Sequence, residues 1–364
     1  MSKMPSELPE QNQQTDFEKL TMLVSEHFQV EEALLEYNIP TFYLKQQQET
    51  KQTFLRLLKK LEELNLTAFL RRIDGRLVLK IFPKPISKPS NVRINWLLFL
   101  ATIGTTFATG YILSKNLATI GGTIDPVIGG AMFTIAIMAI LGLHEMGHKL
   151  TANKNRIEAT PPYFIPGPPP TFGGIGTFGA VIVQKSLPPN KDALFDIGLS
   201  GPVVSFILAV VVTAIGSTMA IPAQPTEGAT TLPTPLIAIF IWMVLSNFRL
   251  TPLPSQEKVL YMHPVEFAGW VGLLITVLNL LPAAMLDGGH IARSLVGDKA
   301  RVILTATSIL LLTLSGFWLM ALFVLFLSSQ RHPGPLDDVS SLSRGRKILA
   351  VALVAIFVLA FPIF

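Results

Sequence analysis

The chain has 364 residues, half of them apolar and only 15 % charged, a composition that excludes an ordinary soluble domain and indicates a polytopic membrane protein. Its net charge of +5 comes without a basic stripe interleaved with aromatic residues, which argues against a nucleic-acid-binding protein. The sequence contains no cysteine, so a metal site must use histidine and carboxylate ligands.

Residues 1–92 carry many charged side chains and are expected to form a small soluble α+β domain that ends in a basic linker. The N-terminus lacks the features of a signal peptide, so delivery would rely on the first membrane span. Asp74-Gly75 is a residue pair typical of a β-hairpin turn. The expected elements are helices over 17–24 and 54–64, a strand over 40–44, and a hairpin of 68–73 and 76–82.

Residues 93–364 are expected to form the membrane domain, an α-helical bundle of about six transmembrane helices and one short segment. The short segment, 235–248, has about 14 apolar residues, which suits a re-entrant, interfacial or tilted helix as well as a crossing. Basic residues flank the first span and favour a cytoplasmic N-terminus. The predicted spans are 94–113, 128–150, 193–221, 264–286, 302–327 and 348–364.

The C-terminal topology has two alternatives. A single crossing by 302–327 would leave four basic residues outside, against the tendency of such residues to stay inside: Arg331, Arg344, Arg346 and Lys347. A helical hairpin bent near Gly316 would remove this conflict, although each arm would then be short for a membrane about 30 Å thick.

The most informative motif is His144-Glu145-Met146-Gly147-His148, which ends an apolar run without charged residues. Ionisable side chains inside a membrane are costly and usually face a partner or a cavity. Residues i and i+4 of a helix share one face, so His144 and His148 can bind one zinc ion while Glu145 reaches a water molecule beside it. The motif therefore predicts a hydrolytic zinc site inside the membrane.

Residues 159–189 are rich in proline and glycine, which excludes a regular helix. We expect an irregular loop or a short β-hairpin that dips toward the site, screened by protein or water. In the following span, Gly198, Ser200, Gly201 and Ser205 are small residues of the kind that let membrane helices approach closely.

A catalytic zinc site usually has a third protein ligand. Glu266 stands near the start of the predicted span 264–286 and Asp287 follows its end, and of these two carboxylates Asp287 is the better candidate. Pro282 and the pair Gly288-Gly289 are expected to break the helix and let Asp287 turn inward. Basic residues just after Asp287 place it at the same membrane level as the His pair.

Two motifs together resemble those of the site-2 protease family of intramembrane zinc metalloproteases. They are His144-Glu145-Met146-Gly147-His148 and the pattern Asn-x-x-Pro-x-x-x-Leu-Asp-Gly, which Asn279 to Gly288 reproduces. The resemblance covers roughly residues 94 to 300, and the stretches 163–183 and 196–202 look most like the archaeal, cyanobacterial and plastid branch. It implies a prokaryotic cell membrane as the location.

The resemblance also implies roles for individual residues. His144, His148 and Asp287 would hold Zn²⁺, Glu145 would act as general base and then acid, and Asn279 would orient the substrate or the tetrahedral oxyanion. On physical grounds alone, Asn279 is as well explained as a polar residue in helix packing. The expected activity is hydrolysis of membrane-anchored protein substrates within the lipid bilayer, near the cytoplasmic side.

The sequence also allows two other interpretations of the function. A metal-ion transporter could use His144, His148 and Asp287 as a transit site, but it would have little need for Glu145. An inactive membrane scaffold would not require the intact motif residues. The sequence carries no signal for an oligomeric state.

Overall fold

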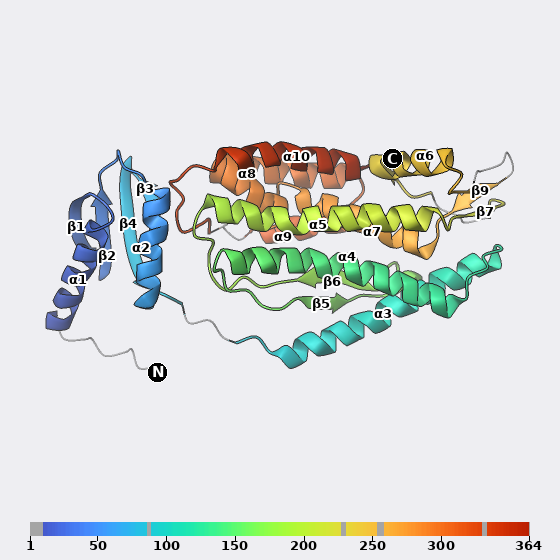
Figure 1. Cartoon of the computed structure of the whole chain (residues 1–364), viewed down its shortest axis with the longest axis horizontal. Helices are drawn as coiled ribbons and strands as arrows, with labels where there is room; N and C mark the ends of the chain where they lie inside the picture. The colour runs from blue at the N-terminus through green and yellow to red at the C-terminus, as the bar shows by residue number, and fades with distance from the viewer. Residues whose placement is uncertain (1–9, 86–88, 227–230, 253–257, 330–332, 364) are drawn as a thin grey trace. The chain divides into compact units, whose positions relative to one another are not determined.

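The structure is a computed structural model that describes residues 10–85, 89–226, 231–252, 258–329 and 333–363 (Figure 1). It is mostly helical and divides into two compact units. The first unit comprises Met1–Lys88, Ser186–Leu194 and Pro333–Leu342, and the second comprises Pro89–Lys185, Phe195–His332 and Ser343–Phe364.

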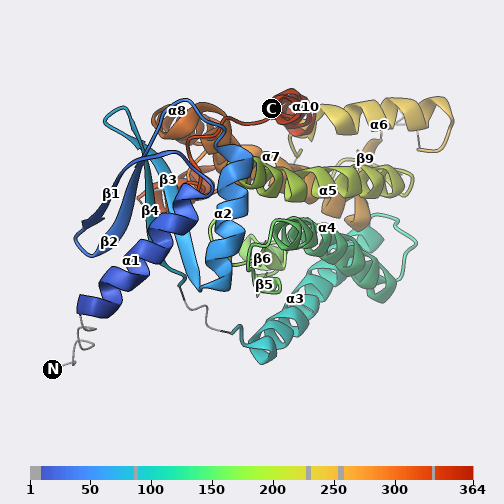
Figure 2. The same ribbon diagram turned by 60° about the vertical axis from the view of Figure 1, so that its left-hand side comes forward.

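The first unit contains the small α+β region that the sequence predicts. Its four-stranded antiparallel sheet has the order β1-β2-β4-β3, and both helices cover one face of this sheet (Figure 2). Asp74 and Gly75 form the predicted hairpin turn, with φ values of 48° and 79°. Its elements are α1 (Glu10–Ser25), β1 (Val30–Glu36), β2 (Ile39–Leu44), α2 (Lys51–Glu63), β3 (Leu66–Ile73) and β4 (Arg76–Pro83).

Two segments that are distant in sequence complete this unit. The amide of Leu70 on β3 donates to the carbonyl of Leu336 at 2.9 Å, and the amide of Asp338 donates back to Leu70 at 3.2 Å. Lys51 on α2 forms an ion pair of 3.0 Å with Asp192 in the first turn of α5. The first unit is therefore discontinuous in sequence.

The second unit contains the apolar helices. Among the described residues, three helices are long and apolar enough to cross a membrane, so the predicted count of six is supported for three. These are α3 (Val92–Thr119), α4 (Pro126–Lys154) and α5 (Lys191–Ser217), while the other helices are α6 (Leu236–Asn247), α7 (Pro264–Leu280), α8 (Asp287–Leu314), α9 (Trp318–Ser328) and α10 (Arg344–Ala360).

The proline- and glycine-rich segment forms a β-hairpin, one of its two predicted alternatives. Asn95 on α3 donates to the carbonyl of Pro162 at 2.9 Å, and Thr105 donates to the carbonyl of Gly176 at 2.6 Å, so α3 holds the hairpin at two levels. The hairpin strands are β5 (Tyr163–Pro166) and β6 (Thr177–Val181), joined through η1 (Pro170–Phe172). The remaining short strands are β7 (Ile221–Ala223), β8 (Thr234–Pro235), β9 (Val259–Tyr261) and β10 (Pro362–Ile363).

The C-terminal segment forms a helical hairpin instead of one continuous helix, and Arg331 lies outside the described residues. The chain turns at Gly316, and α9 packs on α8 through Leu312, Ala321 and Val324. Arg346 in the first turn of α10 binds the carboxylate of Asp196 in α5 through two hydrogen bonds of 2.7 and 2.6 Å. The starts of α5 and α10 therefore lie at one level.

Candidate metal centre

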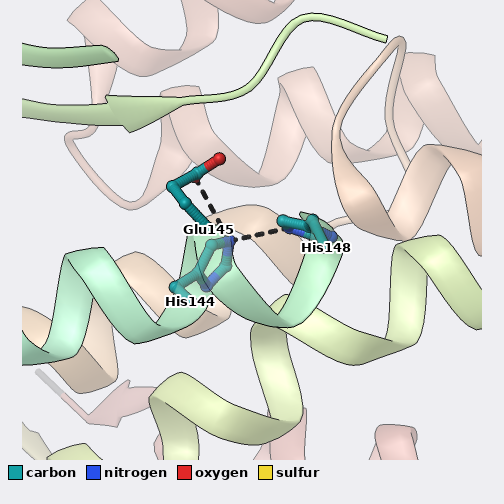
Figure 3. Close-up of side chains that lie close together, drawn as sticks. All are labelled: His144, Glu145 and His148. Atoms are coloured by element: carbon teal, nitrogen blue, oxygen red, sulfur yellow. Dashed lines mark hydrogen bonds and ion pairs between the residues drawn. The ribbon is translucent and has the colours of Figure 1, made fainter. Parts of the chain in front are cut away.

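The two histidines of the motif lie on one face of α4, as the i, i+4 spacing requires. His144 and His148 are 4 % and 5 % exposed, and their Nε2 atoms are 3.1 Å apart. Glu145 is 6 % exposed, and its Oε1 lies 4.0 Å from Nε2 of His144 (Figure 3). One ligand atom from each of the three residues lies within 4.8 Å of the others, so the three side chains form a candidate cluster for a metal ion.

Asp287, the first residue of α8, meets the histidine pair from a distant part of the chain. Its Oδ2 lies 3.3 Å from Nε2 of His144 and 3.3 Å from Nε2 of His148. Glu266 lies in the first turn of α7, at the opposite end from Asn279, where its Oε1 accepts a hydrogen bond from Ser217. The structure thus brings together the His pair and Asp287, but not Glu266.

Both imidazole rings are oriented by hydrogen bonds at Nδ1. Nδ1 of His148 donates to the carbonyl of Ile197 at 2.8 Å. Nδ1 of His144 lies 3.1 Å from Oγ of Ser205, which lies 2.9 Å from Oγ1 of Thr276, and Thr276 donates to the carbonyl of Gly272. We assign the tautomers from this network: each Nδ1 carries the proton, so each Nε2 presents a lone pair.

The residues fit a zinc ion. With the tautomers assigned above, two Nε2 lone pairs and one carboxylate oxygen converge, which is an arrangement that suits a cation at their centre. Zinc bonds of about 2.0–2.1 Å in a tetrahedral site give ligand-to-ligand separations of about 3.3 Å, close to the 3.1 and 3.3 Å found here. Two neutral imidazoles and a carboxylate form a catalytic type of donor set.

Because residue 201 on α5 is glycine, the space beside the Nε2 atoms of His144 and His148 stays open. A Cβ atom at this position would lie 2.2 Å from Nε2 of His148 and 2.7 Å from Nε2 of His144. Any side chain at residue 201 would therefore clash with the two imidazole nitrogens that would bind the metal. The small residues on α5 do more than permit helix packing.

Glu145 and Asn279 flank the three candidate ligands. The backbone amide of Ile182, just beyond β6, hydrogen-bonds the Glu145 carboxylate, so the hairpin reaches the site. Asn279 lies in the last turn of α7, and its Nδ2 is 3.3 Å from Nε2 of His144. Both polar groups can contact a substrate or a water molecule bound at the centre.

Sequence reasoning missed Ser205 and Thr276 as residues that orient His144. It assigned Ser205 to ordinary helix packing and gave Thr276 no role. A hydroxyl group inside an apolar span is only a weak indication of such a role. Most hydroxyl groups of this kind donate to the carbonyl four residues earlier in their own helix.

The expectation that Gly288 and Gly289 break the helix is wrong. Both residues belong to the first turn of α8, and the break lies before them, between Leu281 and Leu286. A Cβ atom at Gly288 would lie 2.2 Å from the carbonyl oxygen of Leu280. This residue lets the start of α8 pack directly against the end of α7.

The sequence of this chain also matches a known protein family. A sequence model of peptidase family M50 matches residues 132–323, more than half of the chain, and this range contains all five candidate site residues. The chain belongs to peptidase family M50. The M50 segment runs from α4 to α9, so the N-terminal α+β elements, α1 to β4, lie outside it.

Several curated plant proteins are similar to this M50 chain. The probable zinc metalloprotease EGY1 of Arabidopsis thaliana, described as chloroplastic, is 26 % identical over 322 residues, which cover 80 % of this chain and 58 % of that protein. EGY2 of the same organism is 28 % identical over 61 % of this chain and 39 % of its own length. The chain thus spans about two fifths to three fifths of these relatives. No solved structure matches.

Proposed function

We propose that this chain is a zinc-dependent intramembrane endopeptidase that hydrolyses peptide bonds of membrane-anchored proteins. His144, His148 and Asp287 would hold the zinc ion. The observation that carries the proposal is the triangle of two Nε2 atoms and one carboxylate oxygen, with sides of 3.1, 3.3 and 3.3 Å, beside Glu145. Membership of family M50 and the zinc metalloprotease relatives support the same reaction class.

Zinc at such a site supplies Lewis acidity, which activates water and polarises the scissile carbonyl. Glu145 would accept the proton of the attacking water and later donate it to the leaving amine nitrogen. The backbone amide of Ile182 interacts with the Glu145 carboxylate. Burial of the three motif side chains limits the access of bulk water to them.

Asn279 would bind the substrate. Its Nδ2 lies beside the candidate ligand His144, where an amide donor can hydrogen-bond the carbonyl oxygen as negative charge develops on it. The position also suits orientation of the substrate backbone. A packing role alone would not require the amide to face the candidate ligands.

We further propose that the site opens toward the cytoplasm and that the N-terminal domain is cytoplasmic. The C-terminal end of α4 is basic, and the basic start of α10 lies level with the start of α5 through the Asp196–Arg346 pair. Because Ile197 in α5 contacts His148, the start of α5 also lies level with the end of α4. The helical hairpin at Gly316 thus removes the charge conflict in the C-terminal topology.

Purified full-length protein in a membrane mimetic tests the proposal. We expect about one zinc ion per chain and cleavage of a model membrane-anchored substrate, with cleavage by Glu145→Gln reduced about 10²- to 10⁴-fold and zinc content retained. Glu18→Gln, on the exposed surface of α1, is the matched control and should cleave normally.

The same variant separates the protease from a metal-ion transporter. A transporter reconstituted in vesicles would move zinc with or without Glu145 and would leave the peptide intact. Full cleavage by Glu145→Gln, or wild-type protein without zinc, would refute the proposed peptidase.

A further inference from the structure

The loop between α7 and α8 contains a strained residue close to the candidate ligand Asp287. Ala284 has φ of +46°, in the left-handed region that residues with a Cβ atom rarely adopt. It is 1 % exposed and precedes Asp287 by three residues. A strained conformation of this kind persists only where the surroundings hold it.

Both backbone polar groups of Ala284 are held by side chains of α8. The amide of Ala284 donates to Oγ1 of Thr305 at 3.1 Å, and Nη1 of Arg301 donates to the carbonyl of Ala284 at 3.4 Å. Oγ1 of Thr305 itself donates to the carbonyl of Arg301, so its lone pair is directed to Ala284. Thr305 and Arg301 are each 5 % exposed.

These contacts require α8 to turn back on itself. Thr305 is 18 residues beyond Asp287, which would place it about 27 Å away along a straight helix at 1.5 Å per residue. Gly297, with φ of 80° and ψ of −174°, interrupts the helical backbone between them. This interruption lets the second half of α8 reach the loop that precedes the first half.

The guanidinium group of Arg301 is oriented by a neighbouring carboxylate. Its Nη2 and Nε atoms donate to Oδ1 of Asp298 at 3.0 and 3.2 Å, which leaves Nη1 directed to Ala284. Downstream, the amide of Leu286 donates to the carbonyl of Ala283, and the amide of His290 donates to the carbonyl of Leu286. The turn at Ala284 is thereby joined to the first turn of α8.

We infer that Thr305 and Arg301 are positioning residues, which hold the left-handed turn at Ala284 and so fix the Asp287 carboxylate against the histidine pair. The inference rests on the proposed function, because it assumes that Asp287 is a zinc ligand. Thr305 contacts neither the candidate ligands nor the motif residues among its hydrogen bonds in the described chain. Its effect is transmitted through the backbone.

The test compares zinc affinity, measured by chelator competition on the full chain, in Thr305→Val, Thr305→Ser and Thr307→Val. Valine removes the acceptor for the Ala284 amide, so zinc affinity should fall about 10- to 100-fold, as for other residues that support metal ligands. Serine keeps the hydroxyl group, so Thr305→Ser should bind zinc about as tightly as the wild type. Thr307, two residues along and exposed, is the matched control and should bind zinc as the wild type does.

A second readout is the absorption spectrum of the cobalt-substituted protein, which reports the ligand geometry and should change only in Thr305→Val. Ala284→Gly tests the strain directly, because glycine adopts this φ without a Cβ penalty. The double variant Ala284→Gly/Thr305→Val should bind zinc within about threefold of Ala284→Gly alone.

Equal zinc affinity in Thr305→Val and Thr307→Val would overturn the inference, as would equal losses in the valine and serine variants. If Thr305→Val does not fold, the double variant decides: recovery of zinc binding supports the inference and failure to recover overturns it. Wild-type protein that binds no zinc would overturn the proposed function itself.

Discussion

Oγ of Ser205 lies 3.1 Å from Nδ1 of His144 and joins this candidate ligand on α4 to a second helix. The same oxygen lies 2.9 Å from Oγ1 of Thr276 on α7. Three helices are thus connected by hydroxyl groups behind the metal centre. The connection fixes the His144 tautomer and the direction of its Nε2 lone pair.

Replacing Ser205 by alanine should weaken zinc binding. The change removes the hydrogen-bond partner of Nδ1, and loss of such a partner typically lowers metal affinity about 10- to 100-fold. Thr213→Val on the same helix is the control, because Oγ1 of Thr213 is buried without a hydrogen-bond partner among the described residues. Chelator competition measures both, and equal affinities would contradict the role of Ser205.

Gly201→Ala should abolish zinc binding while the protein stays folded. The added Cβ would lie 2.2 Å from Nε2 of His148, so the ligand rings cannot close on an ion. Gly104→Ala is the matched control, since a Cβ there has no atom within 4 Å. Zinc content and the unfolding temperature of both variants check the prediction. Normal zinc content in Gly201→Ala would show that the ion lies elsewhere.

Much of the fold follows from local sequence patterns. Long apolar runs predicted α3, α4 and α5 because burial of a backbone in lipid requires a continuous helix. Asp74-Gly75 predicted the β3–β4 turn because both residues tolerate positive φ. Strand β1 was missed: Val30–Glu36 is rich in Glu, Ala and Leu, which favour helices, and only its pairing with β2 makes it a strand.

The candidate site was less predictable where it depends on contacts between helices. The i, i+4 spacing of His144 and His148 is a local property, so the sequence alone indicates their shared face. Ser205 and Thr276 act only because α5 and α7 bring them together behind His144. Gly288 was expected to break the helix, but its role is to allow close approach to Leu280. The sequence alone does not distinguish these two roles of a glycine.

Asp287→Asn should remove zinc, whereas Glu266→Gln should retain it. Asparagine has nearly the same shape but lacks the charge that makes a carboxylate a good zinc ligand, so we expect a loss of at least about 100-fold in zinc affinity. Glu266 is bound to Ser217 at the other end of α7. Metal analysis of the two purified variants gives the answer, and zinc loss in Glu266→Gln instead would reverse the assignment of the third ligand.

Phe178→Pro should lower cleavage without changing zinc content. A helical substrate hides its carbonyls in backbone hydrogen bonds, so it must unwind, and we expect it to pair as an added strand with the hairpin near 173–183. Phe178 is 69 % exposed and lies at the β-bulge, where the β5–β6 register skips it, so proline there removes a backbone amide at a residue that pairs with none of β5. Phe178→Ala, which keeps the amide, is the control. Cleavage assays with a model membrane-anchored substrate should show a loss of about tenfold only in the proline variant, in line with the loss of about one hydrogen bond. Equal rates for the two variants would exclude strand addition at this edge.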